Sequence, residues 1–274
     1  MLKFSVLMSV YKNDDSKHLK SALESIYENQ TLKPNEIVIV LDGPLTSELY
    51  NTIDKFKNDK DPIVIIVPLE KNVGLGEALR IGTTYCSYEY IFRMDADDIS
   101  DSKRFESQVK YLKNNPNIDV LGSDIKEFSV DYRNENMRIR HVPNFHREIV
   151  KMAKRRNPMN HVTVCIKKSA LEKCGGYETL LLLEDYFLWL KMIVNNCRLE
   201  NMNEALVYVR TGKDFNHKRS SKIRITGWRI LQDYMYENGM IKKWETVLNM
   251  LYIKSFVGMP SFVKRILYSF VLRR

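Results

Sequence analysis

The sequence predicts an α/β fold with a central, mostly parallel sheet. Short apolar runs alternate with amphipathic stretches through the first half of the chain. A strand followed by a helix returns the chain to the same edge of a sheet, so this alternation implies parallel strands covered on both faces. With 274 residues, of which 44% are hydrophobic, the chain is long enough to bury a sizeable core.

Each expected element rests on its own pattern. Residues 17–29 predict a helix because five apolar side chains share one face: Leu19, Ala22, Leu23, Ile26 and Tyr27. Further helices are expected at 47–57, 74–86 and 102–114, and strands at 4–10, 36–43, 62–69, 90–95 and 119–123. Beyond residue 140 the alternation loosens, with helices expected at 145–154 and 184–194 and strands at 161–167 and 205–210. Residues 218–274 are expected to be mainly helical, with a break at Pro260.

The positive charge is concentrated in the last part of the chain. Residues 212–274 hold 13 Lys and Arg against 4 Asp and Glu, which accounts for the whole net charge of +9. This asymmetry predicts a neutral body, 1–211, with a basic helical region that meets an anionic surface such as a membrane. Aromatic and aliphatic residues between basic ends in 244–274 fit a helix in a membrane interface, although packing onto the body is an alternative. No recognition motif for nucleic acid accompanies the charge.

The expected location is the cytoplasm. The apolar segment 4–10 is short and lacks a cleavage site after it, so it reads as a strand rather than a signal peptide. No uninterrupted apolar run approaches the ~18 residues that indicate a membrane span. The four cysteines include no C-x-x-C pair, which favours free, buried thiols over disulfides or a zinc site.

Polar residues follow four of the expected strands. They are Tyr11, Asp42, Asn72 and the cluster that begins at Asp95. In α/β sheets, ligands bind beyond the carboxyl ends of the strands. Four polar strand exits at one edge therefore predict a single binding site.

The acidic cluster "MDADD" indicates a divalent cation. Asp95 and Asp97 are two residues apart at a strand exit, where both carboxylates can turn toward one ion. Carboxylate ligands favour Mg²⁺ or Mn²⁺, which complete their shells with water and substrate phosphates. The alternative is a helix N-cap at Asp98 beside solvated loop charges. Arg93 and Arg104 flank the cluster and are candidates for balancing its charge.

Three other nucleotide-binding classes are disfavoured. Leu79 stands where a G-x-G-x-x-G dinucleotide motif needs its third glycine, and no G-x-x-x-x-G-K-[ST] occurs. A sugar-nucleotide pyrophosphorylase would have a Gly-rich, basic loop after its first strand, where this chain reads "SVYKND". A transferase that uses a nucleotide sugar remains.

Five motifs in order resemble family 2 glycosyltransferases. "SVLMSVYKND" is similar to their opening strand and loop, "EIVIVLDG" to the second strand, and "KNVGLGEALRIG" to their N-x-G segment. "FRMDADDIS" resembles the D-x-D loop, and "LLLEDYFLWLKM" the E-D motif. The segments "VYVRTGKDFNHKRSS" and "FVKRILYSFVLRR" resemble a subgroup that builds repeat units of bacterial O-antigen and exopolysaccharide.

The resemblance implies the GT-A fold and a division of the chain. Residues 1–211 would form the catalytic domain, with a nucleotide-sugar-binding half at 1–100 and an acceptor half at 101–211. Residues 212–274 would form the basic helical C-terminal region. The implied donor-binding residues are Val10, Tyr11, Asp42, Asn72, Gly74, Arg93, Asp95, Ala96 and Asp97.

The resemblance also implies the remaining roles. Asp185 would be the general base, with Glu184 beside it. Alternatively, the two acids mark the start of a helix, where the helix dipole favours negative charge, and the two interpretations are compatible. His161 and Asp98 would lie on the acceptor side, although a lone His beside a strand is more often structural. Asp95 and Asp97 would bind Mn²⁺ or Mg²⁺, with His217 as a candidate third ligand or part of a loop that contacts diphosphate.

The expected function is glycosyl transfer with inversion. We expect the pKa values of Glu184 and Asp185 to be raised toward the working pH. The apolar residues before them would desolvate both carboxyls, and each carboxylate would repel the charge of the other. One base and no evident nucleophile imply a single displacement that turns an α-linked UDP-sugar into a β-glycoside. The resemblance to the subgroup suggests a β-1,3 linkage. The acceptor would be a saccharide, lipid-diphosphate-linked, at the inner face of the cell membrane. The alternatives are a non-catalytic sugar-nucleotide-binding module and a metal-dependent phosphohydrolase or nucleotidyltransferase.

Overall fold

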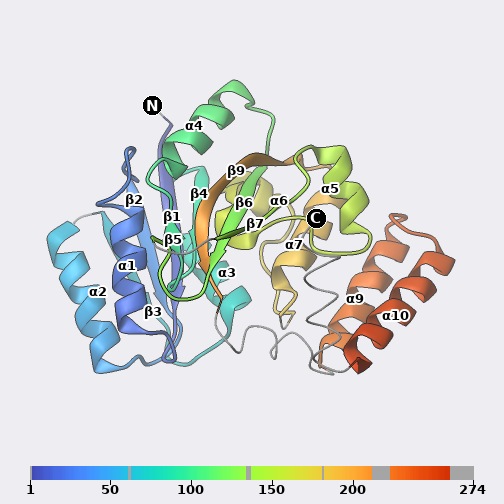
Figure 1. Cartoon of the computed structure of the whole chain (residues 1–274), viewed down its shortest axis with the longest axis horizontal. Coiled ribbons are helices and arrows are strands. Elements are labelled where there is room, and N and C mark those ends of the chain that lie inside the picture. The colour runs from blue at the N-terminus through green and yellow to red at the C-terminus, as the bar shows by residue number, and fades with distance from the viewer. Residues whose placement is uncertain (1, 61–62, 134–136, 181, 212–222, 260–274) are drawn as a thin grey trace.

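A nine-stranded sheet crosses the molecule, and helices cover both of its faces (Figure 1). The computed structural model describes residues 2–60, 63–133, 137–180, 182–211 and 223–259. The strand order is β3-β2-β1-β4-β8-β6-β9-β5, and β7 pairs with β6. The bounds are β1 Phe4–Val10, β2 Glu36–Leu41, β3 Val64–Pro68, β4 Tyr90–Met94, β5 Ile99–Ser100, β6 Val120–Phe128, β7 Arg138–Arg140, β8 Cys165–Lys167 and β9 Leu199–Arg210. The expected α/β architecture is confirmed.

The sheet is parallel in its N-terminal half and mixed beyond it. β1 pairs in parallel with β2 and with β4, and β2 pairs in parallel with β3. β8 is antiparallel to both β4 and β6, whereas β6 and β9 run parallel to each other. The parallel part brings the carboxyl ends of β1, β2 and β4 to one edge, as the sequence predicts.

Helices pack on each face through apolar residues. One face is covered by α1 Ser16–Ile26, α2 Ser47–Lys60 and α4 Arg104–Asn114, and the other by α3 Leu75–Tyr85, α5 His146–Ala153, α6 Lys168–Lys173 and α7 Glu184–Val194. α3 lies very close to the sheet at Gly82, where an added Cβ would come within 2.5 Å of Leu7 and 2.6 Å of Val40. The four cysteines are buried and free, as expected.

Some local expectations are wrong. The expected strand 161–167 begins instead as a 3-10 helix, His161–Thr163, and only Cys165–Lys167 forms the strand β8. The short strands β5 and β7 and the helix α6 have no counterpart among the expected elements. Asp98 does not cap a helix, because β5 follows it directly and the N-cap of α4 is Lys103.

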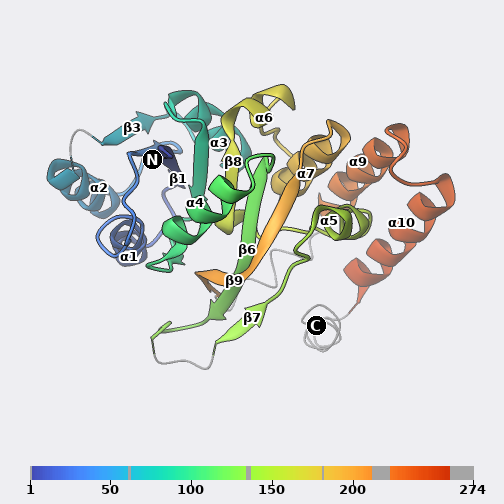
Figure 2. The ribbon, with the colours of Figure 1, turned by 90° about the horizontal axis from the view of Figure 1, so that it is seen from above.

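Two further helices extend the molecule at the end opposite α2 (Figures 1 and 2). They are α9 Ile223–Glu237 and α10 Lys243–Gly258, which agrees with the helical C-terminal region expected. α9 packs on α7: the rings of Tyr186 and Trp228 lie 5.4 Å apart, and those of Phe187 and Tyr234 lie 5.1 Å apart. Among the helices described, none is long and apolar enough to cross a membrane.

Candidate active site

The loop after β3 is tied to the end of β2 by Asp42. This carboxylate is 4% exposed and accepts hydrogen bonds from Asn72 Nδ2 (2.9 Å) and from the backbone N–H groups of Val73 (2.7 Å) and Gly74 (3.1 Å). Gly43 makes the contact possible, since its φ is +85° and an added Cβ would lie 2.6 Å from the nitrogen of Asn72. Three predicted donor-binding residues, Asp42, Asn72 and Gly74, thus form one unit at the start of α3.

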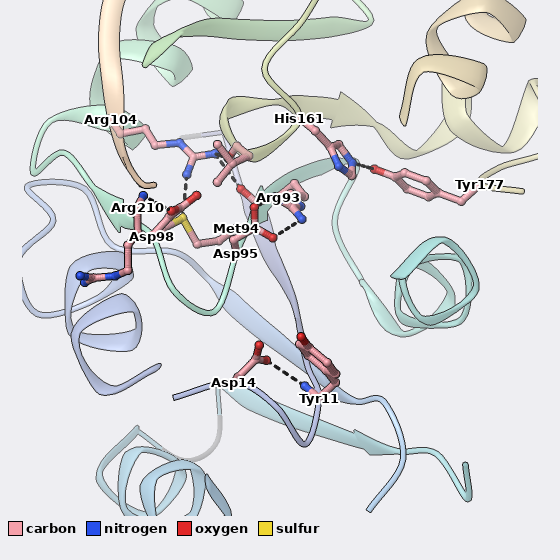
Figure 3. A network of polar contacts seen from close by, with 11 residues as sticks. Tyr11, Asp14, Arg93, Met94, Asp95, Asp98, Arg104, His161, Tyr177 and Arg210 are labelled. Carbon is pink, nitrogen blue, oxygen red and sulfur yellow. Dashed lines mark hydrogen bonds and ion pairs between the residues drawn. The ribbon is translucent and has the colours of Figure 1, made fainter. Parts of the chain in front are cut away.

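Arg93 and Asp95 form a bidentate ion pair at the end of β4 (Figure 3). The Arg93 side chain is 4% exposed and the Asp95 side chain 33% exposed. Burial alone would lower the pKa of Arg93, but the Asp95 carboxylate raises it above its ordinary value. The expectation that Arg93 balances the acidic cluster is therefore correct for Asp95.

The other two acids of the cluster differ in exposure. Asp97 reaches solvent, but it lies in a dense part of the protein, and this desolvation together with the Asp95 carboxylate raises its pKa to about 6. Asp98 is 3% exposed, and burial followed by its two acidic neighbours raises its pKa well above the ordinary value. Its Oδ1 accepts a hydrogen bond from the backbone N–H of Arg210 at 2.8 Å. The predicted acceptor contact of Asp98 stays a prediction.

Arg104 binds the backbone next to the acidic loop. It is fully buried and donates to the carbonyl oxygens of Arg93 (2.8 Å) and Val162 (3.0 Å). Burial lowers its pKa to about 9, which leaves it protonated at neutral pH. Its hydrogen bonds go to carbonyls, Gln108 and the Met94 sulfur rather than to an acid, so the charges of Asp95 and Asp98 act on Arg104 only through space.

His161 is held by a buried tyrosine. Its Nε2 lies 2.9 Å from the hydroxyl of Tyr177, and its ring lies 5.9 Å from that of Trp189. Burial, and then the nearby Arg93 guanidinium, lower the pKa of His161 well below its ordinary value. The ring is therefore neutral at physiological pH and suits a hydrogen-bonding role rather than a charged one.

Glu184 and Asp185 form the first turn of α7. Asp185 Oδ2 accepts from Asn157 Nδ2 at 2.6 Å, and Oδ1 accepts from the backbone N–H of Tyr186 at 2.7 Å. Burial raises the pKa of Asp185, and these hydrogen bonds partly offset the rise. Burial and the Asp185 charge raise the pKa of Glu184 to about 7. The carboxyls thus have the raised pKa values expected of a general base site.

The acidic loop and the two carboxyls both lie near the buried phenol of Tyr177. Burial raises the pKa of Tyr177, and the charges of Arg93, Asp95, Glu184 and Asp185 all act on the same phenol. In Figure 3, Asp95, Arg93, His161 and Tyr177 lie one after another from the centre of the view to the right. Asp98 and Arg210 lie to the left of Asp95. An added Cβ on Gly76 would lie 3.2 Å from Cβ of Glu184, so the start of α3 also abuts this turn.

The raised pKa of Glu184 predicts a pH-dependent cost in stability. The unfolded chain, with a pKa of 4.5, loses this proton before the folded protein, with a pKa of about 7. Folding stability therefore falls as pH rises through this window. Glu184→Gln is expected to raise the free energy of unfolding by only ~1–2 kcal/mol at pH 8, because solvent partly screens the charge of this half-buried side chain, and to leave it unchanged at pH 4. Urea unfolding at both pH values measures this, with exposed Glu172→Gln as the control; equal shifts at both would contradict it.

Asp95 and Asp97 have the chemistry of a site for Mn²⁺ or Mg²⁺. Asp97 is exposed, and the Asp95 side chain is 33% exposed although both of its oxygens accept from Arg93. Such ions commonly take one or two carboxylates and complete the shell with water and phosphate oxygens. Within the described residues, no group of three or more His, Cys, Asp or Glu could hold a metal on its own. The residues fit an ion that is shared with a diphosphate ligand. His217 lies outside the described residues.

The remaining predicted donor residues differ in accessibility. Val10 is fully buried and Ala96 is 5% exposed, so their side chains fill the core beneath the edge. Tyr11 is half-buried, and its backbone N–H donates to Asp14 Oδ2 at 2.9 Å. A contact from Val10 or Ala96 to the donor would have to come from the backbone.

Sequence reasoning missed four residues of the site. Asn157 donates to the candidate base Asp185, and Tyr177 contacts His161. The backbone N–H of Arg210 donates to Asp98, and the carbonyl of Val162 accepts from Arg104. Arg210 also donates through Nε to the carbonyl of Asp97 at 3.2 Å. The one available signal was "RRNPMNH", where two Asn flank a short loop before His161.

Comparisons with known proteins identify the family. The family model described as glycosyl transferase family 2 matches residues 5–175. An Escherichia coli protein, UDP-Gal:alpha-D-GlcNAc-diphosphoundecaprenol beta-1,3-galactosyltransferase, is 36% identical over 277 residues, which cover 99% of this chain and 97% of that protein. The amylovoran biosynthesis glycosyltransferase AmsE of Erwinia amylovora is 35% identical over 84% of this chain and 82% of its own length.

A solved structure supports the fold. The crystal structure of S. aureus TarS 1-349 in complex with UDP-GlcNAc matches with a TM-score of 0.66 and 19% identity, over 98% of this chain and 73% of that one. At this level of identity the likeness concerns the fold alone. It confirms the expected GT-A fold.

Proposed function

The chain belongs to glycosyl transferase family 2, and from this premise we propose that it moves a sugar from a UDP-sugar to a lipid-diphosphate-linked saccharide. The reaction inverts the anomeric configuration and forms a β-glycosidic bond in the synthesis of a surface polysaccharide. The E. coli relative named above supports a UDP-linked donor, a diphosphate-lipid acceptor and a β-1,3 linkage, because it aligns over nearly the whole of both chains.

The observation that carries this proposal is that the acidic loop and the two carboxyls of α7 both lie near one buried tyrosine, Tyr177, which contacts His161. The buried phenol of Tyr177 interacts with charges from both parts. One part fits the diphosphate of a nucleotide sugar and the other fits a proton acceptor. A transferase needs both within one site, whereas a binding module needs no base.

The mechanism is a single displacement. The acceptor hydroxyl gives its proton to the carboxylate of Asp185 as its oxygen forms a bond to the anomeric carbon, and the bond from that carbon to the diphosphate oxygen breaks to release UDP. Asn157 orients the carboxylate of Asp185. A divalent ion held by Asp95 and Asp97 would, when bound, offset the negative charge on the diphosphate. Arg93 keeps Asp95 in place at the end of β4.

The proposed division of labour follows the chain. Residues 1–100 bind the donor, residues 101–211 present the base and the acceptor side, and residues 212–274 serve attachment to the cytoplasmic face of the membrane. The unit of Asp42, Asn72 and Gly74 supports the first assignment, since it shapes the loop beside the nucleotide end of the site. Asp185 in α7 supports the second.

The test is UDP release from a panel of UDP-sugars, starting with UDP-galactose. Purified full-length protein is assayed with Mn²⁺, Mg²⁺ or EDTA, and with or without a GlcNAc- or GalNAc-diphosphate-lipid analogue. We expect release that depends on both metal and acceptor, and a product that a β-specific galactosidase cleaves when galactose is the donor. Release without acceptor would instead indicate a phosphohydrolase, and binding without turnover a sugar-nucleotide-binding module.

A further inference from the structure

The outer face of α10 is apolar and exposed. Five large side chains, each more than half exposed, occur at spacings of three and four residues and so share one side of the helix: Trp244, Val247, Leu248, Leu251 and Tyr252. We call them the α10 apolar face. Figure 1 shows α10 at the outer edge of the molecule, beyond α9.

The opposite side of α10 is fixed to the body. Asn249 Nδ2 donates to Gln232 Oε1 of α9 and to the carbonyl of Lys154, both at 2.9 Å. Ile253 is 7% exposed on the same side. These contacts determine which side of α10 turns outward, so the α10 apolar face is a fixed surface of the described protein.

Exposed apolar residues elsewhere in the described chain are scattered. Of thirteen large hydrophobic side chains that are exposed, five belong to the α10 apolar face. The others are spread over several elements, as single residues usually are on a protein surface: Tyr50, Tyr85, Val130, Ile139, Phe145, Leu182, Ile230 and Tyr236. A contiguous apolar surface of this kind marks an interaction site.

We propose that the α10 apolar face docks on an anionic lipid bilayer. Trp244 and Tyr252 stand at its two ends, and these residue types favour the headgroup level of a membrane. Lys242, Lys243 and Lys254 flank the apolar residues and are exposed. The one acid of the helix, Glu245, is engaged in its cap, where its Oε2 accepts from the N–H of Lys242 at 2.8 Å.

Charge favours a bilayer over a second copy of the chain. In sequence, residues 260–274 contain four Lys and Arg and no Asp or Glu, directly after α10. Two copies that met through α10 would bring Lys242, Lys243 and Lys254 of one copy toward those of the other, whereas an anionic bilayer attracts them. Apolar contact together with nearby basic side chains favours binding to an anionic membrane surface.

The docking surface is connected to the candidate base. α10 packs on α9, and α9 packs on α7 through Tyr186, which follows Asp185 in the chain. Tyr186 also donates to the carbonyl of Ala153 at 2.6 Å, next to the Lys154 carbonyl that Asn249 of α10 contacts. This use of the surface rests on the proposed function: a bilayer at α10 would supply a lipid-linked acceptor to the acceptor side.

Vesicle flotation tests the docking without any turnover. Full-length protein is mixed with vesicles of phosphatidylcholine alone or with phosphatidylglycerol, at low and high salt. Leu248→Ser/Leu251→Ser is expected to bind the anionic vesicles about 10-fold or more weakly than the unmodified protein. Tyr85→Ser/Ile139→Ser, which removes two exposed apolar side chains elsewhere, is the matched control and is expected to bind normally. Trp emission should shift to the blue on anionic vesicles, and Trp244→Phe should remove most of this shift.

The possible results separate the explanations. Equal vesicle binding by the α10 double variant and the control would overturn the proposal. So would a dimer of the unmodified protein that the double variant abolishes without any change in vesicle binding, because a second copy would then cover the face. Thermal unfolding verifies that each variant is folded. UDP release with a water-soluble acceptor analogue should be unchanged in the double variant, so loss of docking is distinct from failure of the proposed function.

Discussion

Asp185→Asn is expected to slow sugar transfer by about 10²–10⁴-fold while leaving the affinity for the UDP-sugar unchanged. The substitution keeps the size of the side chain but removes the group that accepts the proton. Asn157 and the N–H of Tyr186 both donate to Asp185, and either can still donate to the amide oxygen of Asn. The measurements are UDP release at saturating donor and calorimetric binding of UDP. The effect should appear in the turnover number rather than in KM.

The control for this experiment is Asp233→Asn, because Asp233 is exposed on α9, away from the site. It is expected to transfer sugar at the normal rate. A normal rate in Asp185→Asn itself would show that another group takes the proton. Glu184, whose pKa is raised to about 7, would then be the residue to replace next.

Asp97→Asn is expected to weaken Mn²⁺ binding and to slow transfer on the order of 10²–10³-fold. Asp97 is exposed, so its loss should leave the fold intact. Asp95→Asn should have a similar effect on the metal but should also destabilise the protein, because it leaves the buried Arg93 without its partner. Titration of Mn²⁺ by electron paramagnetic resonance reports binding apart from activity.

Thermal unfolding distinguishes the two substitutions. The melting temperature should fall in Asp95→Asn, whereas in Asp97→Asn it should not fall and should rise slightly above pH 6, because the raised pKa of Asp97 shows that its charge is unfavourable in the folded protein. Exposed Asp54→Asn of α2 is the control. Full activity in EDTA, together with unaltered Mn²⁺ binding in both variants, would show that the acidic loop does not hold a metal. The loop would then serve the diphosphate in some other way, with Arg93 as the nearest cation.

The N-terminal half of the fold was predictable because its signals are local. β1, β2, β3 and β4 are apolar runs with turn residues at their ends, as buried strands of a parallel sheet usually are. β5, with two residues, and β7, with three, are too short to show any period. They form because β9 and β6 are already there to pair with them.

The site was predictable only in part, for the same reason. Asp42, Asp95 and Asp185 follow strands or start helices, so motif and position identified them. Their partners come from far along the chain: Asn157 precedes Asp185 by 28 residues, and Arg210 follows Asp98 by 112. No periodicity links such pairs. Arg93 was a candidate for balancing the acidic cluster because it flanks the cluster in sequence, and Asp95 is its ion-pair partner.

The bond between Asp98 and the N–H of Arg210 has a consequence for how the protein is made. The loop that carries Asp95 and Asp97 emerges from the ribosome early, but the last residue of β9 that closes it emerges only after most of the chain has been synthesised. Closing so long a loop is entropically costly until the intervening strands are paired. We therefore expect the nascent protein to complete the proposed donor site late, and a chain that ends before Arg210 to bind a sugar nucleotide more weakly than the whole chain.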